Sequence, residues 1–193
     1  MNDVSGAQET NAKLMEYLLR SKFASDGLAP DLIRCQLKVD GLALQTASKA
    51  LQNNRSIVQL AVKENGLALQ FASHELRGDR DIVLKAVRGS GGALAFASLE
   101  LRADLEIVLE AVSDCGGALE FASESLRGDK IVVLAAVRNH GSSLEFSSEQ
   151  LRDDKSVVIE AVHSYALALE HASDSLKADR FCPFTKKLTS SNS

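Results

Sequence analysis

The stretch GLALQFASHELRGDRDIVLKAVRGS, residues 66–90, decides the fold because it recurs along most of the chain. The 25 residues before it match it column by column, and so do the stretches that follow. Successive units begin, with no insertion or deletion between them, at Gly41, Gly66, Gly91, Gly116, Gly141 and Ala166. A fixed period of about 20 to 50 residues is typical of a repeat array. Positions below are counted from the first residue of each unit.

Two columns of the repeat, positions 4 and 11, hold leucine in every unit. With alanine or serine at position 7 and serine at position 8, these leucines follow the i, i+3, i+4, i+7 spacing of one helical face. The spacing predicts one short helix in the first half of each unit. For the serine column, the hydroxyl is expected to bond back to the preceding turn of that helix. A hydroxyl-lined binding groove is the alternative.

Position 14 is always Asn or Asp, and an apolar run follows it. A side-chain oxygen there can accept from the unpaired N–H groups of a new helix, so a second helix is predicted to begin at this position. Its apolar face in the second unit comprises Ile82, Val83, Ala86 and Val87. The second helices are expected to end at glycines such as Gly89, Gly91 and Gly116.

Position 12 is basic from the second unit onward, and a cation suits the C-terminal end of the first helix. The residues are Arg77, Arg102, Arg127, Arg152 and Lys177. Position 6 holds aromatic side chains that lie off the leucine stripe and are expected to contact the adjacent unit. These are Phe71, Phe96, Phe121 and Phe146.

A unit of 25 residues with two short helices cannot bury its own apolar face, so neighbouring units must stack and share one core. The sequence therefore predicts an all-α fold, an α-solenoid of helix-turn-helix repeats over residues 41–180. Residues 1–40 are predicted to form capping helices, one over residues 11–24 and a second that starts at Pro30. Residues 181–193 are expected to be an irregular tail.

The blocks GLALQFAS, LRGDR and IVLKAV resemble the helical repeat family catalogued as domain of unknown function 4116, over about residues 41–180. The resemblance implies a helical repeat and brings no catalytic residue or cofactor to transfer. A more distant similarity is to leucine-rich repeat variant and HEAT-like arrays.

Composition and termini narrow the class of protein. The 193 residues carry a formal charge of -4, which disfavours wholesale nucleic-acid binding. The three cysteines, Cys35, Cys115 and Cys182, form no disulfide framework, which favours a reducing compartment. No leader peptide is expected in the first residues, and the longest apolar stretch, residues 131–137, is far shorter than the roughly 20 residues of a membrane span. We expect a cytoplasmic protein.

The residue pattern contains no recognisable catalytic motif. The four histidines fall at four different repeat positions, and no nucleotide-binding loop is present, so neither a metal nor a cofactor is expected. The Arg-Gly-Asp tripeptides at residues 77–79 and 127–129 are interpreted as interhelix turns. We expect a non-enzymatic protein. The alternative is an enzyme or small-ligand binder with a pocket on the concave face, for which the candidates are Ser98, Ser123, His140 and Cys115.

Charge changes along the array. Residues 41–90 contain 7 basic and 4 acidic residues, a net of +3, whereas residues 91–165 contain 6 basic and 13 acidic residues, a net of -7. The leading hypothesis is an interaction module or scaffold, or a subunit of a larger assembly, that binds a basic protein partner on its later units. The candidate surface comprises Glu120, Glu124, Glu145, Glu149 and Glu170. A solvated face is the alternative, and nucleic-acid binding through the position-12 arginines is a third hypothesis.

Overall fold

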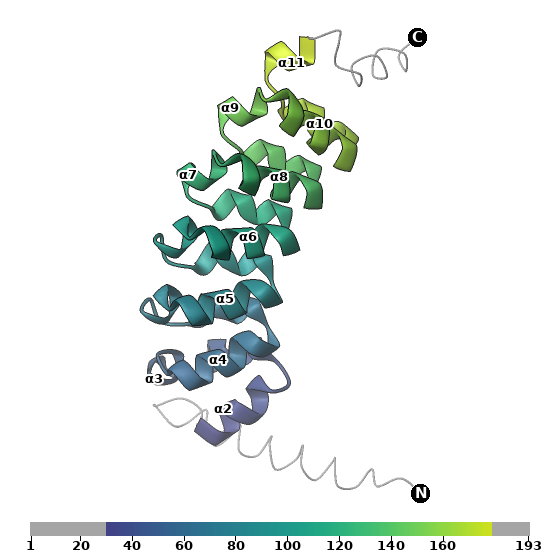
Figure 1. The fold of residues 1–193 in the computed structure, drawn as a ribbon. Helices are drawn as coiled ribbons and strands as arrows, with labels where there is room; N and C mark the ends of the chain where they lie inside the picture. The colour runs from purple at the N-terminus through teal and green to yellow at the C-terminus, as the bar shows by residue number, and fades with distance from the viewer. Residues whose placement is uncertain (1–29, 179–193) are drawn as a thin grey trace, which may run out of the picture.

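The computed structural model describes residues 30–178, which form an elongated stack of short helices (Figure 1). Every regular element in this range is helical, and no strand occurs there. The units stack in chain order from helix α2, Pro30–Leu37, at one end to α11, Asp174–Ala178, at the other. The chain is an all-α solenoid, as the repeat predicts.

Each unit contains three helical segments. The first is a six-residue 3-10 helix: η1 Gly41–Thr46, η2 Gly66–Phe71, η4 Gly91–Phe96, η6 Gly116–Phe121, η7 Gly141–Phe146 and η8 Ala166–His171. The second is a single turn: α3 Lys49–Gln52, η3 Leu76–Gly78, η5 Leu101–Ala103, α7 Glu124–Arg127, α9 Glu149–Arg152 and α11. The third is a ten-residue α-helix: α4 Arg55–Glu64, α5 Arg80–Gly89, α6 Leu105–Asp114, α8 Lys130–Asn139 and α10 Lys155–Ser164.

These segments form two layers and an edge. Each ten-residue α-helix contacts the α-helix of the next unit, and each 3-10 helix contacts the next 3-10 helix. The core lies between the layers, where the position-4 leucines and the Ile, Val and Ala side chains of the α-helices are buried. The single turns follow one another along one side of the stack (Figure 1).

The second helix of each unit begins as predicted. Asp79 accepts hydrogen bonds from the backbone N–H groups of Asp81 and Ile82, both at 3.1 Å. The same cap is made by Asn54, Asp104, Asp129 and Asp154. The predicted apolar face is also confirmed, because Ile82, Val83, Ala86 and Val87 have no exposed surface. Asp179 lies outside the described residues.

The prediction of one helix in the first half of the unit is wrong. In the third unit the 3-10 helix ends at Phe96, and the chain is extended at Ala97 before the single turn begins at Leu101. The Ser98 N–H donates to the carbonyl of Arg77 in the preceding unit, at 2.9 Å. The chain therefore leaves the helix to make a hydrogen bond between units. The position-4 leucines still face the core, because a 3-10 helix, with three residues per turn, aligns position 4 with the buried glycine of position 1. The position-11 leucines lie on the single turns, where Leu76 and Leu151 are buried and the other four are half-buried.

The expected helix ends are only partly correct. Helix α5 does end at Gly89, but Gly91 and Gly116 begin the 3-10 helices of the next units. Each ten-residue α-helix is followed by an extended C-cap residue at position 25, such as Ser90, whose N–H donates to the Ala86 carbonyl at 2.9 Å. The same residue is the N-cap of the following 3-10 helix.

Helix α2 packs on η1 and α4 at the N-terminal end of the array. Its Ile33 and Leu37 side chains are fully buried. The predicted helix over residues 11–24 and the predicted tail over residues 181–193 lie outside the described residues.

Candidate functional site

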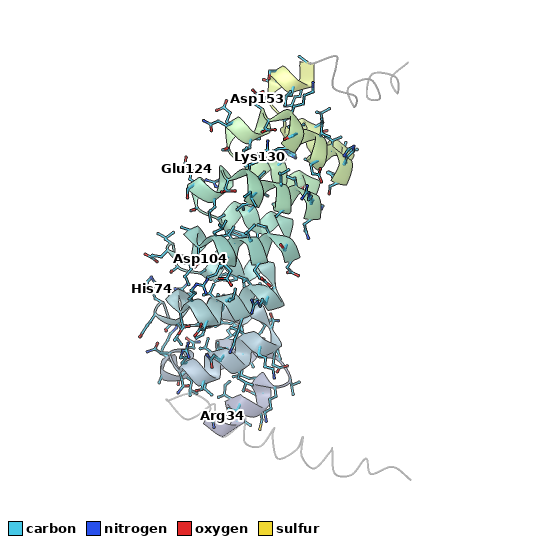
Figure 2. The ribbon with its side chains drawn as sticks, in the orientation of Figure 1. Arg34, His74, Asp104, Glu124, Lys130 and Asp153 are labelled. Atoms are coloured by element: carbon cyan, nitrogen blue, oxygen red, sulfur yellow. The ribbon has the colours of Figure 1, made fainter. Side chains whose placement is uncertain are left out.

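The predicted partner-binding residues lie on the 3-10 helices and on the single turns of the fourth to sixth units. Glu120, Glu145 and Glu170 stand at position 5 on the 3-10 helices, and Glu124 and Glu149 stand at position 9, where α7 and α9 begin. All five side chains are exposed. We call these five residues the acidic row. His74, also at position 9, projects on the same side of the stack as Glu124 (Figure 2).

The acidic row differs from the acids on the α-helices in its charge environment. Within residues 30–178, none of its five carboxylates makes an ion pair. On the α-helix side, by contrast, cations of one unit bind acids of the next. These pairs include Arg55 with Asp79 at 2.8 Å, Lys130 with Asp154 at 2.6 Å and Arg138 with Glu160 at 2.8 Å.

The pKa values of these N-cap carboxyls reflect that pairing. The hydrogen bond from Arg55 is the main cause of a lowered pKa at Asp79. At Asp154, hydrogen bonds from Lys130 and then Ser156 lower the pKa to about 2. Asp79 and Asp154 are therefore held ionised by cations within the molecule, whereas the carboxylates of the acidic row have no such cation beside them.

A polar pocket adjoins the acidic row between the fifth and sixth units. It has a volume of about 400 Å³ and is lined by Glu149, Gln150, Asp153, Ser173 and Ser175. The Asp153 carboxylate accepts hydrogen bonds from both serine hydroxyls, which lower its pKa. With Glu149 beside it, the pocket presents two carboxylates to solvent.

The position-12 arginines form a half-buried column along the edge formed by the single turns. The Arg102 Nε donates to the Ala97 carbonyl at 3.1 Å, and its Nη2 donates to the Ala95 carbonyl. Arg102 thereby binds the C-terminal carbonyls of its own 3-10 helix. The Nε atoms of Arg77, Arg127 and Arg152 are buried and have no hydrogen-bond partner among the described residues.

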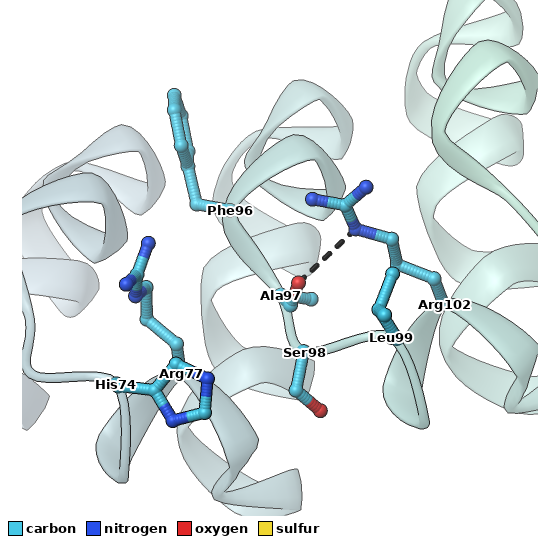
Figure 3. A pocket seen from close by; sticks show the side chains of 7 residues that line it. All are labelled: His74, Arg77, Phe96, Ala97, Ser98, Leu99 and Arg102. Atoms are coloured by element: carbon cyan, nitrogen blue, oxygen red, sulfur yellow. Dashed lines mark hydrogen bonds between the residues drawn. The ribbon is translucent and has the colours of Figure 1, made fainter.

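A second pocket lies between the second and third units (Figure 3). It has a volume of about 180 Å³ and is lined by His74, Arg77, Phe96, Ala97, Ser98, Leu99 and Arg102. Phe96, at position 6, therefore lines a pocket together with His74 and Arg77 of the preceding unit. Sequence reasoning missed this pocket, although the fixed period already places Arg77 and Arg102 in the same column.

The four residues of the enzyme alternative do not come together in one site. Ser98 and Ser123 precede the single turns, close to the N-terminal ends of the α-helices. Cys115 and His140 follow the C-terminal ends of α6 and α8, and a ten-residue helix is about 15 Å long. The His140 ring stacks on Tyr165 of the next unit, with ring centroids 5.8 Å apart.

The serine column has a capping role that differs from the predicted one. The Ser73 hydroxyl accepts from the N–H of Leu76, three residues later, at 3.3 Å. Ser48, Ser98, Ser123 and Ser173 accept in the same way. The hydroxyls therefore cap the following turn and do not bond back to the preceding one, because the chain is extended at position 8.

The described part of the chain contains neither a cluster of metal ligands nor a membrane-spanning helix. Among residues 30–178, no three His, Cys, Asp or Glu side chains are grouped so that they could hold a metal ion. In the same range, no helix has the length and apolar character needed to cross a membrane.

Comparison with known proteins identifies one family. A family model with the description Domain of unknown function (DUF4116) matches four times, over residues 37–77, 60–102, 79–127 and 104–152. The matches overlap and together span residues 37–152. No curated protein and no solved structure matches the chain at a significant level.

Proposed function

Because the chain belongs to the family described as Domain of unknown function (DUF4116), a description that names no activity, we propose its function from its own surface. The array is a non-enzymatic interaction module, or scaffold, and its acidic row binds a basic segment of a protein partner.

The observation that carries this proposal is the contrast between two groups of acids in one molecule. Most acids of the α-helix layer are paired with cations of the preceding unit, as Asp104 is with Arg80 at 3.0 Å. Within the described residues, those that make no ion pair are Glu64, Asp114 and Asp129. The carboxylates of the acidic row have no such partner within the described residues. A row of unneutralised charge attracts a molecule of opposite charge and raises its association rate.

The repeat makes this row suitable for an extended partner. Its glutamates recur at the same two positions in successive units, so they follow the long axis of the stack. The pocket of Glu149 and Asp153 can receive one lysine or arginine side chain of such a segment, with its ammonium or guanidinium group against the two carboxylates. We also propose a cytoplasmic location, which the exposed free thiols of Cys35 and Cys115 support.

The test compares the wild-type chain with two variants of equal charge. The row variant replaces Glu120, Glu124, Glu145, Glu149 and Glu170 by Gln. The control variant makes the same number of Glu→Gln or Asp→Asn changes on the α-helices, at Glu64, Asp81, Glu106, Glu110 and Glu160. Binding of a fluorescent lysine-rich peptide is measured by polarisation, with a glutamate-rich peptide as the negative control.

The wild type and the control variant should bind the lysine-rich peptide, with an affinity that falls as salt is added, and the row variant should lose at least about tenfold in affinity. Affinity purification from the native cell, with the same three proteins, should recover a partner that the row variant does not retain. Equal binding by the row and control variants would refute the proposal.

A further inference from the structure

The pocket between the second and third units has a charge opposite to that of the acidic row. Two guanidinium groups, those of Arg77 and Arg102, line it from adjacent units, together with the imidazole of His74 (Figure 3). None of its seven lining residues carries a carboxylate. Glu100 lies beside the pocket, where its own backbone N–H, the Ser98 hydroxyl and the charge of His74 lower the pKa of its carboxyl.

The two arginines differ in how they are satisfied. Arg102 is held by the carbonyls of Ala95 and Ala97. The Arg77 side chain makes no hydrogen bond within the described residues, and its Nε is buried. A guanidinium group that lines a pocket and has no acceptor for its N–H groups binds an acceptor supplied by another molecule favourably. One arginine is therefore preorganised and the other lacks an acceptor.

Only this junction, among those of the described units, combines two position-12 arginines with no acid at position 9. Its position-9 residues are His74 and Leu99. The later junctions bring Glu124, Glu149 and Asp174 to the same position, next to the equivalent cations. Arg127 and Arg152 therefore have acids at position 9 beside them, whereas the acids of the second and third units, Glu75 and Glu100, stand at position 10 and do not line the pocket.

We propose that the pocket between the second and third units binds one side chain of a protein partner. That side chain has an apolar stem and ends in an oxyanion, which is either a carboxylate or a phosphate monoester. Guanidinium groups bind both oxyanions through paired N–H donors. The apolar part of the ligand lies against the ring of half-buried Phe96 and against Leu99, which is 76% exposed.

The size of the pocket selects a side chain over a free small molecule. Its volume of about 180 Å³ is below the roughly 300–1,000 Å³ of small-molecule sites. Nucleic acid fits less well, since the backbone phosphates would continue onto the acidic row. The inference rests on the proposed function and deepens it: the partner segment has an anionic anchor at this pocket and basic residues over the acidic row.

The test uses the isotopically labelled full chain and three small probes that share a phenyl ring. Phenyl phosphate and phenylacetate are the anions, and benzyl alcohol is the neutral control. Both anions, or one of them, should cause saturable shifts of the backbone amide signals of His74, Ser98 and Leu99, and benzyl alcohol should not. Binding by phenyl phosphate alone identifies a phosphorylated anchor, and binding by phenylacetate alone identifies an acidic one.

Variants locate the site. Arg77→Gln should weaken anion binding by about tenfold, because it removes the guanidinium that lacks an acceptor. Arg127→Gln, the same change in the same column between the acidic units, should leave binding unchanged. Glu100→Gln should strengthen binding about two- to threefold, since it removes a negative charge beside the pocket.

Three results would overturn the inference: no saturable shift with either anion, equal losses in the Arg77 and Arg127 variants, or equal shifts with benzyl alcohol. An oligonucleotide that shifts signals along the whole arginine column would overturn it in favour of nucleic-acid binding. Arg77→Gln should leave binding of the lysine-rich peptide intact, so this inference can fail while the proposed function stands.

Discussion

Glycine at position 1 of the repeat is required by a close approach of two backbones and not by a left-handed turn. A Cβ atom on Gly91 would lie 2.2 Å from the carbonyl oxygen of Ala111, on the α-helix of the same unit. On the neighbouring Gly92, the nearest atom would be 3.9 Å away, and neither glycine has a left-handed φ. Gly91→Ala should therefore destabilise the protein by about 1–3 kcal/mol. Gly92→Ala should be neutral or stabilise it by about 0.4–1 kcal/mol. Urea unfolding followed by circular dichroism measures both, and equal losses would contradict the packing described here.

The position-4 leucine and its neighbour at position 5 face opposite environments. Leu119 has no exposed surface, whereas Glu120 is exposed. Leu119→Ala should lower the free energy of unfolding by about 2–5 kcal/mol, because it leaves a cavity in the core. Glu120→Ala should change it by no more than about 0.5 kcal/mol. The pair is compared by chemical denaturation, and similar effects would mean that the register of the 3-10 helix is wrong.

At the scale of the element, the N-cap of each α-helix couples stability to pH. The pKa of Asp154 is lowered from 3.8 to about 2, chiefly by Lys130. A lowered pKa in the folded state adds stability above the unfolded value, and this is lost as pH falls through the folded value. Asp154→Asn keeps a capping oxygen, as Asn54 shows at α4, but removes the charge.

The Asp154→Asn variant should be about 1 kcal/mol less stable than the wild type at neutral pH, a value limited by solvent screening. The difference should shrink towards zero as pH falls from about 4 to about 2. Urea unfolding at a series of pH values measures it, with Glu149→Gln as the unpaired control. A constant difference across that range would show that the charge of Asp154 is not responsible.

Leu105 interrupts the series of ion pairs between successive α-helices. Position 15 is Arg55, Arg80 and Lys130 in the first, second and fourth units, and each reaches the N-cap acid of the next unit. Leu105, at the same position in the third unit, is 47% exposed. Leu105→Arg should pair with Asp129 and raise the free energy of unfolding by about 0.2–1 kcal/mol. Leu105→Gln is the matched control, and a gain as large in that variant, or one unaffected by salt, would exclude an ion pair as the cause.

At the scale of the whole molecule, the α-helix and the 3-10 helix of each unit pack against their counterparts in the adjacent units. In such an array, stability is close to a sum of unit and interface terms. The losses in the free energy of unfolding caused by Leu69→Ala and Leu144→Ala, which are three units apart, should therefore add to within about 0.5 kcal/mol in the double variant. Leu94→Ala and Leu119→Ala, in adjacent units, should deviate from additivity by about 0.5–3 kcal/mol. Denaturation of the four single and two double variants tests this, and coupling between the distant pair would argue against an array of nearest-neighbour contacts.

The sequence by itself determined the period, the buried columns and the starts of the α-helices. These features follow from local rules, since Asp79 caps the residues that directly follow it and Leu119 is apolar in a repeated frame. The exposure of the acidic row was predictable on the same basis, because Glu120 and Glu124 lie off the leucine stripe.

Only the tertiary structure decided where the first half of each unit breaks, why position 1 is glycine, and which charges are left without a partner. Each depends on an atom that is distant in the chain. The Arg77 carbonyl that accepts from Ser98 and the cations that pair with the α-helix acids belong to the preceding unit, and the Ala111 carbonyl against Gly91 belongs to the α-helix of the same unit. Helical periodicity within one helix contains no information about these partners, because they meet only when the helices pack.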